Sequence, residues 1–297
     1  MKIRVSSGTA SYLSLQNGNM LEDPTTAYIL IPGKECRGAC LYCPQGKGDS
    51  RWLSRVSWPL FELENFIDKV RTSDLKRICL QSPDIEEYEE KIVRIVNALD
   101  KTGKPISVSS PPLSDETLKA IKGLVDHIGV GIDAATNHIR KRTKPNYPPL
   151  VFWDYLGRAV DTFGSENVTA HIIVGMGEDL EQLGATVNRI FEIGTEVSLF
   201  PLLLKDHEVD ISYYRKAQLL TNILERGETL IDSLNTIEED LEGYLEEVEL
   251  GEVFRTRGCP GCNRPFYTSK PGKEHKNYPR RPTIEEIQKI KEELDIL

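Results

Sequence analysis

Three cysteines lie close together near the start of the chain, in the run Cys-Arg-Gly-Ala-Cys-Leu-Tyr-Cys that contains Cys36, Cys40 and Cys43. Three thiolates at this spacing can wrap around one corner of a compact metal centre. Zinc sites prefer cysteines in pairs two residues apart, with further ligands at matching spacing, and no such second pair follows nearby. This first cysteine group therefore favours a four-iron cluster with one open iron over a zinc or redox knuckle.

The remaining cysteines are Cys79, Cys259 and Cys262, which we call the second cysteine group. Taken alone, the Cys-Pro-Gly-Cys run of Cys259 and Cys262 could be a zinc knuckle or a disulfide pair. Cys79 alone would more often be a buried core residue than a ligand. A cytosolic setting disfavours a disulfide, and no second knuckle lies within the usual spacing.

The spacing C-x3-C-x-aromatic-C, with Tyr42 before the last cysteine, resembles the motif of the radical S-adenosylmethionine (SAM) superfamily. In that family the three cysteines hold a [4Fe-4S] cluster, and the amino and carboxylate groups of SAM chelate its fourth iron. One electron then cleaves SAM to a 5′-deoxyadenosyl radical, which abstracts hydrogen from unactivated carbon. The resemblance implies an enzyme that uses Cys36, Cys40 and Cys43 in this way.

Two other segments resemble SAM-binding elements of this family. The run Val-Gly-Met-Gly-Glu-Asp at 174–179 resembles the Gly-Leu-Gly-Glu-Thr element of biotin and lipoyl synthases, whose backbone packs against adenine. A plain strand-to-helix turn is the alternative. The run Gly-Ile-Asp at 131–133 resembles the stretch whose polar side chains bind the ribose hydroxyls. The resemblance implies SAM contacts from Tyr42, Asp133, Asn137, Arg140, Val174, Gly175 and Met176.

Basic residues follow this second segment, and one of them could pair with the cofactor carboxylate while the others are surface charges. They are Arg140, Lys141, Arg142 and Lys144. The family's frequent Gly-Gly-Glu after the second strand is replaced by Gln-Ser-Pro-Asp at 81–84. This departure leaves the residues that bind the methionine part of SAM unassigned.

Biotin synthase places a ligand of an auxiliary cluster on its second strand, where Cys79 stands in this sequence. The resemblance therefore implies that Cys79, Cys259 and Cys262 converge on a second [4Fe-4S] cluster. Its fourth ligand is open among protein side chains and a non-protein ligand. The candidate side chains are Ser107, Ser109, Ser110 and Arg257.

The run Arg-Thr-Arg-Gly-Cys-Pro-Gly-Cys-Asn-Arg-Pro-Phe-Tyr at 255–267 resembles proteins of the biotin synthase-related group. Two proteins of that group act together as a split lipoyl synthase. The resemblance implies a sulfur-inserting transferase that adds sulfur from the second cluster to a protein-bound octanoyl or mercapto-octanoyl chain. It also implies three partners, namely the other synthase component, an octanoylated lipoyl-domain or H-protein, and an electron donor such as ferredoxin.

Rival interpretations stay open. Biotin synthase acts on a free small molecule, but its auxiliary ligands come mostly from successive barrel strands. Another radical enzyme with an auxiliary cluster, such as a dehydrogenase or maturase, is also compatible with the motifs. From a different class, the chain could be a non-catalytic iron–sulfur or zinc protein.

Six β-branched runs that close at Pro, Gly or Asp predict strands, with helical patterns between them. The expected strands are 27–35, 76–84, 105–110, 127–134, 168–177 and 196–205. This series predicts an α/β fold, a partial (β/α)6 TIM-type barrel with parallel strands. A doubly wound sheet is the alternative. Expected helices include 61–73, 86–103 and one capped by Ser114. His171 is interpreted as a core histidine rather than a ligand.

We expect three regions: an irregular N-terminal lead-in at 1–26, the barrel at 27–212 and an iron–sulfur-binding C-terminal extension at 213–297. In that extension, an acidic helical stretch at 225–252 precedes a basic, turn-rich loop at 255–281. A final helix should dock on the main body through Ile284, Ile287 and Ile290. Basic loop residues would suit docking of an acidic carrier protein or could line the cofactor pocket.

Composition sets the outer limits. The chain has 297 residues, a formal net charge of −9 and 39% hydrophobic residues, which is typical of a globular protein with a sizeable core. The acidic balance argues against nucleic-acid binding. The sequence has no apolar run of membrane-spanning length and no apolar core of a signal peptide near its start, so we expect a cytoplasmic protein with no membrane partner.

Overall fold

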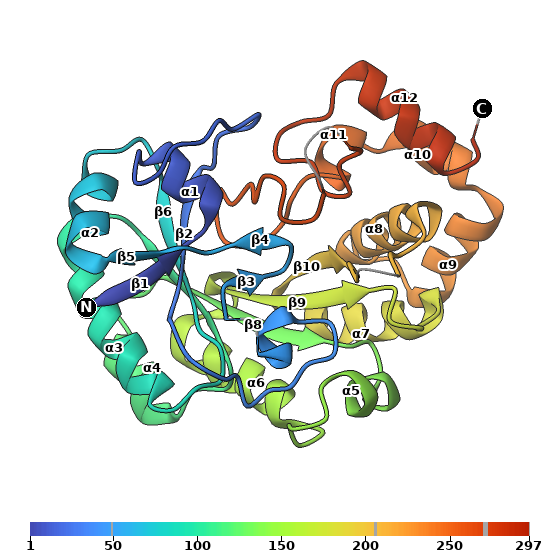
Figure 1. Ribbon diagram of the computed structural model, residues 1–297. Helices are drawn as coiled ribbons and strands as arrows, with labels where there is room; N and C mark the ends of the chain where they lie inside the picture. The colour runs from blue at the N-terminus through green and yellow to red at the C-terminus, as the bar shows by residue number, and fades with distance from the viewer. Residues whose placement is uncertain (49, 205–206, 270–272, 297) are drawn as a thin grey trace.

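The computed structural model describes residues 1–48, 50–204, 207–269 and 273–296. In these residues an eight-stranded sheet has the order β10-β9-β8-β7-β6-β2-β1-β5 (Figure 1). Its six parallel strands are β2 (Thr26–Leu30), β6 (Arg77–Gln81), β7 (Ile106–Ser110), β8 (His127–Asp133), β9 (Val168–Val174) and β10 (Glu196–Pro201). The six expected strands are therefore present, each shorter at its end than expected except the third; Lys205 lies outside the described residues.

The parallel strands follow one another in sequence order across the sheet. A doubly wound sheet would reverse direction at a switch point, so this order supports the singly wound arrangement of a partial barrel. Helices and short 3-10 turns fill the crossovers: α3 (Tyr88–Leu99), η2 (Asp100–Thr102), α4 (Asp115–Ile121), α5 (Asn137–Thr143), α6 (Val151–Phe163), η3 (Ser165–Asn167) and α7 (Leu180–Glu192). The chain is an α/β protein with a mostly parallel central sheet.

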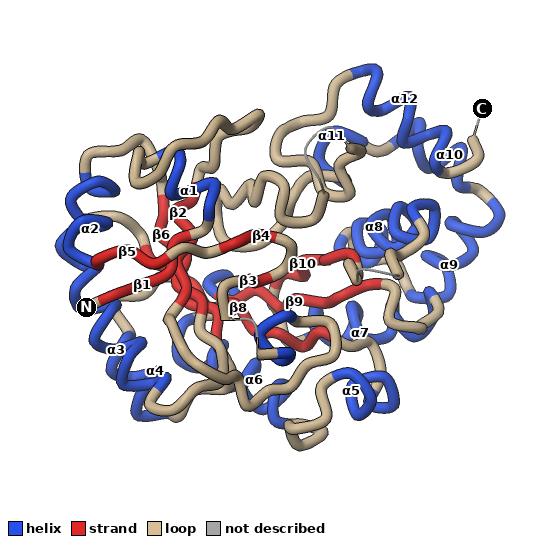
Figure 2. Tube along the Cα trace, in the orientation of Figure 1, coloured by secondary structure: helices blue, strands red, loops and turns tan. Residues whose placement is uncertain are grey.

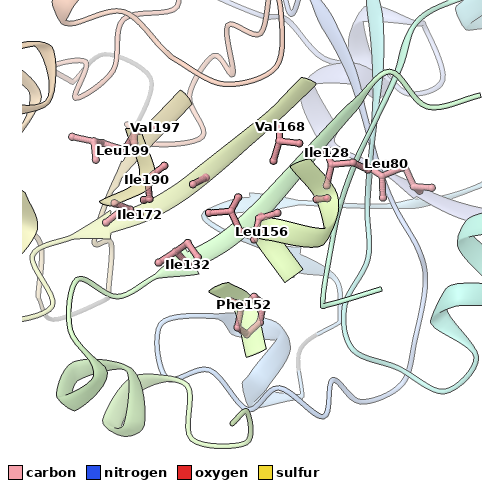
Figure 3. Packing of buried hydrophobic residues seen from close by; sticks show 14 of the residues in the cluster. Leu80, Ile128, Ile132, Phe152, Leu156, Val168, Ile172, Ile190, Val197 and Leu199 are labelled. Carbon is pink, nitrogen blue, oxygen red and sulfur yellow. The ribbon is translucent and has the colours of Figure 1, made fainter. Parts of the chain in front are cut away.

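Alternate residues of each parallel strand face opposite sides of the sheet. One side packs under the helices and is apolar; in Figure 3, Phe152 and Leu156 of α6 lie beside Ile132 of β8. The other side lines the interior of the curved sheet and carries Ser109 and Gly129 among other small or polar residues.

The N-terminal lead-in is more ordered than expected. Residues Lys2–Val5 form β1, which pairs antiparallel with β2 and with β5 (Leu60–Glu62). Helix α1 (Ser7–Tyr12) follows, capped by the Ser6 side chain. The segment after the first cysteine group forms η1 (Pro44–Lys47) and a hairpin of β3 (Trp52–Leu53) and β4 (Val56–Ser57), ahead of α2 (Leu63–Arg71). Short strands of alternating residues next to Gly and Ser give a weak sequence signal, which explains the difference.

Four helices follow β10 in the C-terminal part before an irregular segment: α8 (Ile211–Glu225), α9 (Leu230–Glu239), α10 (Leu241–Glu247) and α11 (Leu250–Val253). The acidic stretch is thus divided rather than continuous. The basic segment has no regular helix in its described residues, as expected, and Figure 2 shows it as loop between α11 and α12 (Ile284–Glu293). In α12, Ile290 is buried, but Ile284 is 84% exposed and does not dock.

No helix in the described part of the chain combines the length and the apolar character needed to cross a membrane.

Candidate active site inside the sheet

The first cysteine group lies on the loop that follows β2, at the carboxyl end of the parallel strands. Backbone bonds tie this loop to two neighbours: the amide of Arg37 donates to Asp84 O (2.7 Å), and that of Leu41 donates to Thr143 O (2.9 Å). The turn η1 packs against the loop so closely that a Cβ on Gly46 would lie 2.7 Å from the Cys40 nitrogen. Glycine is therefore required at this position for the loop to keep its path.

Burial shapes the chemistry of these thiols. It raises the pKa of Cys40 to about 12 and, despite backbone hydrogen bonds from Gln45 and Gly46, that of Cys43 to about 11. Both side chains are thus protonated thiols at neutral pH when nothing is bound. Metal binding must displace these protons, so the affinity of this site for metal rises with pH.

Tyr42 connects the cysteine loop to the end of β8. Its hydroxyl donates to Asp133 Oδ2 at 2.6 Å, and the Lys144 ammonium donates to the same oxygen at 2.7 Å. Lys144 also donates to Gly131 O at 2.9 Å and lies 3.3 Å from the Phe152 ring centroid. Asp133 and Lys144 are largely buried, at 15% and 7% side-chain exposure. The expected residues Tyr42 and Asp133 are therefore joined directly, with Lys144 as the basic partner.

The turn between β9 and α7 is held by the carboxylate of Glu178. It accepts from the backbone nitrogens of Gly175 (2.5 Å) and Met176 (2.9 Å), while Arg142 donates to Met176 O (2.7 Å). Gly175 has φ +102°, and a Cβ there would lie 2.6 Å from Val209 Cβ. The Met176 side chain belongs to an apolar cluster that Tyr42 also contacts. The turn thus lies next to the cysteine loop.

Other residues expected to bind SAM lie elsewhere. Val174 is fully buried in the core under the helices. Asn137 and Arg140 line a separate pocket next to Phe152 and Trp153, and Arg140 donates to Tyr147 O at 2.9 Å. Neither Asn137 nor Arg140 lines the cavity that Asp133 lines.

A cavity of about 240 Å³ lies inside the curved sheet, and we call it the central cavity. Both cysteine groups contribute to its walls: the residues that matter here are Tyr42, Cys43, Asp133, Cys79, Cys259 and Cys262. His171, interpreted from sequence as a core residue, also lines it and packs edge-on against Phe200. Residues more than two hundred positions apart therefore face one cavity.

The second cysteine group lies deeper in the sheet than the first. Cys79 is the middle residue of β6 rather than near its carboxyl end. Hydrogen bonds hold the loop of Cys259 and Cys262 at the amino ends of β2 and β6. Arg77 Nε, in the first residue of β6, donates to Pro260 O (3.2 Å), and Thr25 Oγ1, just before β2, donates to Gly261 O (2.6 Å). The first group stands at the carboxyl ends of the strands, so the two groups lie at different depths of one cavity.

The neighbours of the second group favour thiolate at Cys259 alone, because the hydrogen bond with Cys259 raises the pKa of Cys79 and burial raises that of Cys262. A hydrogen bond with Cys79 lowers the pKa of Cys259 to about 7, helped by a hydrogen bond with Ser107 and by the nearby positive charge of Arg77. Arg264 supplies a second cation and is 9% exposed, yet its Nε has no hydrogen-bond partner in the described structure. Buried guanidinium charge with spare donor capacity suits an anionic group such as a thiolate-bound cluster.

Positions of the four candidate fourth ligands now differ. Ser107 hydrogen-bonds with Cys259, and Ser109 lines the central cavity. The Ser110 hydroxyl donates to Pro111 O, and Arg257 pairs with Glu225 at 2.6 Å. The last two side chains are therefore engaged elsewhere.

Among the described residues, no three His, Cys, Asp or Glu side chains gather around a point that could hold a single metal ion. Thiolates of a four-iron cluster each bind a different iron, so cluster ligands need not converge on one point. Cys43 of the first group and all three cysteines of the second group line one cavity, and thiols are the donors that iron–sulfur clusters use.

The sequence model described as the radical SAM superfamily matches residues 30–190, which is more than half of the chain. This protein belongs to the radical SAM superfamily. That family implies an enzyme with a [4Fe-4S] cluster and SAM, and the first cysteine group lies within the matched region.

Two solved structures are similar at low identity. TYW1 with a lysine-pyruvate adduct bound is 12% identical with a TM-score of 0.46, over 74% of this chain and 81% of that chain. The HMG-CoA lyase from Brucella melitensis is 14% identical with a TM-score of 0.38, over 80% and 85%. At these TM-scores neither likeness bears on the activity of this chain. No curated protein matches it.

Proposed function

We propose that this radical SAM enzyme inserts sulfur into an alkyl chain, as one component of a two-protein lipoyl synthase. The observation that carries the proposal is that Cys43 of the first group and all three cysteines of the second group line the central cavity. When bound, SAM on the first cluster would supply a radical that removes hydrogen from carbon, and the second cluster would supply the sulfide that bonds to that carbon. An enclosed site is required, because an alkyl radical would otherwise react with solvent or protein.

The chain's own residues have separable tasks in this proposal. Cys36, Cys40 and Cys43 hold the first cluster, while Tyr42 and Asp133 hold SAM. Cys79, Cys259 and Cys262 hold the second cluster. The substrate is an octanoyl or mercapto-octanoyl group on a lipoyl-domain or H-protein, and the partners are the other synthase component and a low-potential electron donor such as ferredoxin.

The test combines the anaerobically reconstituted protein with an octanoyl-lysine peptide, SAM, a low-potential reductant and each candidate partner protein. Mass spectrometry should detect one added sulfur per peptide together with 5′-deoxyadenosine. Iron analysis should give about eight iron atoms per chain, whereas about four would remove the sulfur donor. Cofactor cleavage without sulfur on either octanoyl or mercapto-octanoyl peptide would overturn the lipoyl assignment, and sulfur on free dethiobiotin would favour the biotin synthase alternative.

Replacing Cys79 or Cys262 with Ala provides the matched comparison. We expect either variant to lose about half of its iron and all sulfur transfer while it still forms 5′-deoxyadenosine. Cys43→Ala should instead lose cofactor cleavage. Loss of cleavage from Cys79→Ala would mean that Cys79 stabilises the sheet and is not a ligand.

A further inference from the structure

A second pocket adjoins the central cavity on the open side of the sheet, next to the edge strand β10. Its volume is about 680 Å³, and we call it the outer pocket. Leu203 and Thr268 line both spaces, so they form the boundary between them. Leu203 follows the end of β10, and Thr268 belongs to the irregular segment that carries the second cysteine group. The two spaces therefore meet at a point made by two distant parts of the chain.

The wall of the central cavity has polar and apolar parts. Thiols, Gln81 and Ser109 line it, and so do the apolar side chains of Ile173, Phe200, Leu202 and Leu203. Ile173 and Leu202 pack in one apolar cluster. Such a wall favours a saturated hydrocarbon chain, because burying apolar surface against it removes that surface from water.

The outer pocket is charged, and its positive groups exceed the negative groups that pair with them. Lys276 pairs with Glu208 (2.8 Å) and Lys289 pairs with Glu274 (2.5 Å). Glu293, which also lines the pocket, pairs with the buried Arg215 (2.8 Å).

The outer pocket is also lined by two further cations, Arg55 and Lys273. Arg55 donates to the backbone oxygens of Phe266 and Ser269, and Lys273 is exposed. Glu208 acts on Arg55 and Glu274 on Lys273 through electrostatics, but each of these two carboxylates also pairs with a lysine, so the described lining of the pocket keeps an excess of positive charge. This mouth is therefore complementary to a negatively charged protein surface.

We propose that the outer pocket and the central cavity form one passage for a linear saturated acyl chain attached to an acidic carrier protein. The carrier stays at the mouth near Lys273, and the chain passes between Leu203 and Thr268 to place its distal carbons between the two cysteine groups. This inference rests on the proposed sulfur insertion for the identity of the chain. It adds the route of the acyl chain, the place where the carrier binds and the residues that control entry.

The test places a large side chain at the boundary. In anaerobically reconstituted protein, Leu203→Trp should narrow the passage, and Leu203→Met should keep its volume as the matched control. Calorimetry would measure the dissociation constants for an octanoylated and an unmodified lipoyl domain. In the wild type and Leu203→Met, the octanoyl group should tighten binding by roughly tenfold, and in Leu203→Trp it should add nothing.

Iron content should stay at the wild-type level in both variants, which shows that they still fold and hold their iron. If Leu203→Trp does not fold, Thr268→Leu narrows the same point from the other side. If the octanoyl group still tightens binding in both Leu203→Trp and Thr268→Leu, the proposed passage is wrong. Because binding is measured without turnover, this result is independent of sulfur transfer: tight, blockable binding without sulfur product would overturn the proposed function and leave the passage standing.

Lys273→Glu tests the mouth separately. It should weaken binding of both carrier forms by roughly threefold, and the difference should shrink at high salt, because an exposed charge acts through screened electrostatics. Equal affinity in this variant and the wild type at low salt would contradict the place assigned to the carrier.

Discussion

Asp133 links the loop of the first cysteine group to the end of β8. It has φ +63°, a left-handed backbone conformation that is unusual for a residue with a side chain, beside an irregularity in the pairing of β8 with β9. Its carboxylate accepts hydrogen bonds from Tyr42, which precedes β8 in the sequence, and from Lys144, which follows it. A strained residue fixed by two donors is typical of a functional position, because the surrounding structure must stabilise it.

Asp133→Asn should destabilise the protein by about 3 kcal/mol, because it leaves the buried Lys144 ammonium without its counter-charge. Asn accepts a left-handed backbone as readily as Asp, so the change isolates the charge. The measurement is the urea midpoint of the cluster-free protein. The double variant with Lys144→Met should recover part of the loss, whereas equal midpoints for wild type and Asp133→Asn would show that the pair contributes nothing.

Gly46→Ala should prevent the first cysteine group from holding its cluster. The new Cβ would meet the backbone of Cys40, which cannot move without shifting the cysteine loop. Iron per chain should fall by about half after reconstitution, and 5′-deoxyadenosine should not form. Gly157→Ala is the matched control: nothing lies within 4 Å of its added Cβ in α6, so iron content should not change. A full iron complement in Gly46→Ala would contradict this reading of the loop.

At the scale of the elements, one face of a parallel strand packs in the core and stabilises the fold, and the other face carries the residues of the site. In β6, Ile78 and Leu80 belong to the core under the helices, and Cys79 faces the central cavity between them. In β7, Ile106 belongs to that core while Ser109 faces the cavity. Alternation of this kind indicates which residues of a barrel strand can act on a ligand.

The turn after β9 can be tested through Glu178. Glu178→Gln replaces one accepting oxygen by an amide group, so one of the amides of Gly175 and Met176 loses its acceptor in a buried place. Affinity for SAM, measured by equilibrium dialysis with the reconstituted enzyme, should fall by roughly tenfold. Glu181→Gln, on the exposed first turn of α7, should bind SAM as the wild type does. Unchanged affinity in Glu178→Gln would separate this turn from the cofactor.

His127 at the start of β8 should make stability depend on pH. Burial, together with nearby Arg77, lowers its pKa to about 4, while Asp126 opposes this shift. The unfolded chain therefore binds more protons than the folded chain between about pH 6.5 and 4, and stability falls as pH falls through this window. His127→Gln should show a flatter urea midpoint between pH 7 and 5 than the wild type, and His138→Gln, at an exposed position, should not. Identical slopes in all three proteins would contradict this assignment.

Order and type of the strands were predictable because six β-branched runs alternate with helical patterns. The first cysteine group was predictable because its spacing is local. Lys144 was one of four basic candidates, and sequence had no means to choose it, since the choice depends on how α5 turns back towards β8. Arg264 and Glu178 stood inside recognised motifs, but their roles depend on contacts with backbone and cavity that a linear pattern does not contain.

At the scale of the whole molecule, the C-terminal part completes the interior of the sheet. Arg215 on α8 is fully buried and pairs with Glu293 of α12. It also donates to His275 O (2.7 Å) and Lys276 O (2.8 Å) in the irregular segment. One guanidinium therefore fixes the last helix and the lining of the outer pocket together.

Arg215→Met should lower the free energy of unfolding by about 3 kcal/mol or more, because it leaves Glu293 unpaired in a buried place and frees two backbone oxygens. Iron analysis should also show loss from the second cysteine group, since its segment loses support. Arg158→Met is the control, as its pairs with Asp115 and Asp154 involve exposed carboxylates and should contribute little. Full iron content at normal stability in Arg215→Met would contradict this role.

The two cysteine groups also differ in when they can exist during synthesis. The first is complete as soon as residues 36–43 have left the ribosome. The second forms only after residues 259–262 have been synthesised and have reached Cys79. Residues 260–264 form hydrogen bonds with Arg77, Thr25 and Tyr28, which lie in or next to β2 and β6. When this C-terminal segment docks, it closes the side of the sheet at the amino ends of these strands. The two cysteine groups therefore form in a fixed order on a nascent chain: the first can bind its iron–sulfur cluster early, whereas the second is completed only near the end of synthesis.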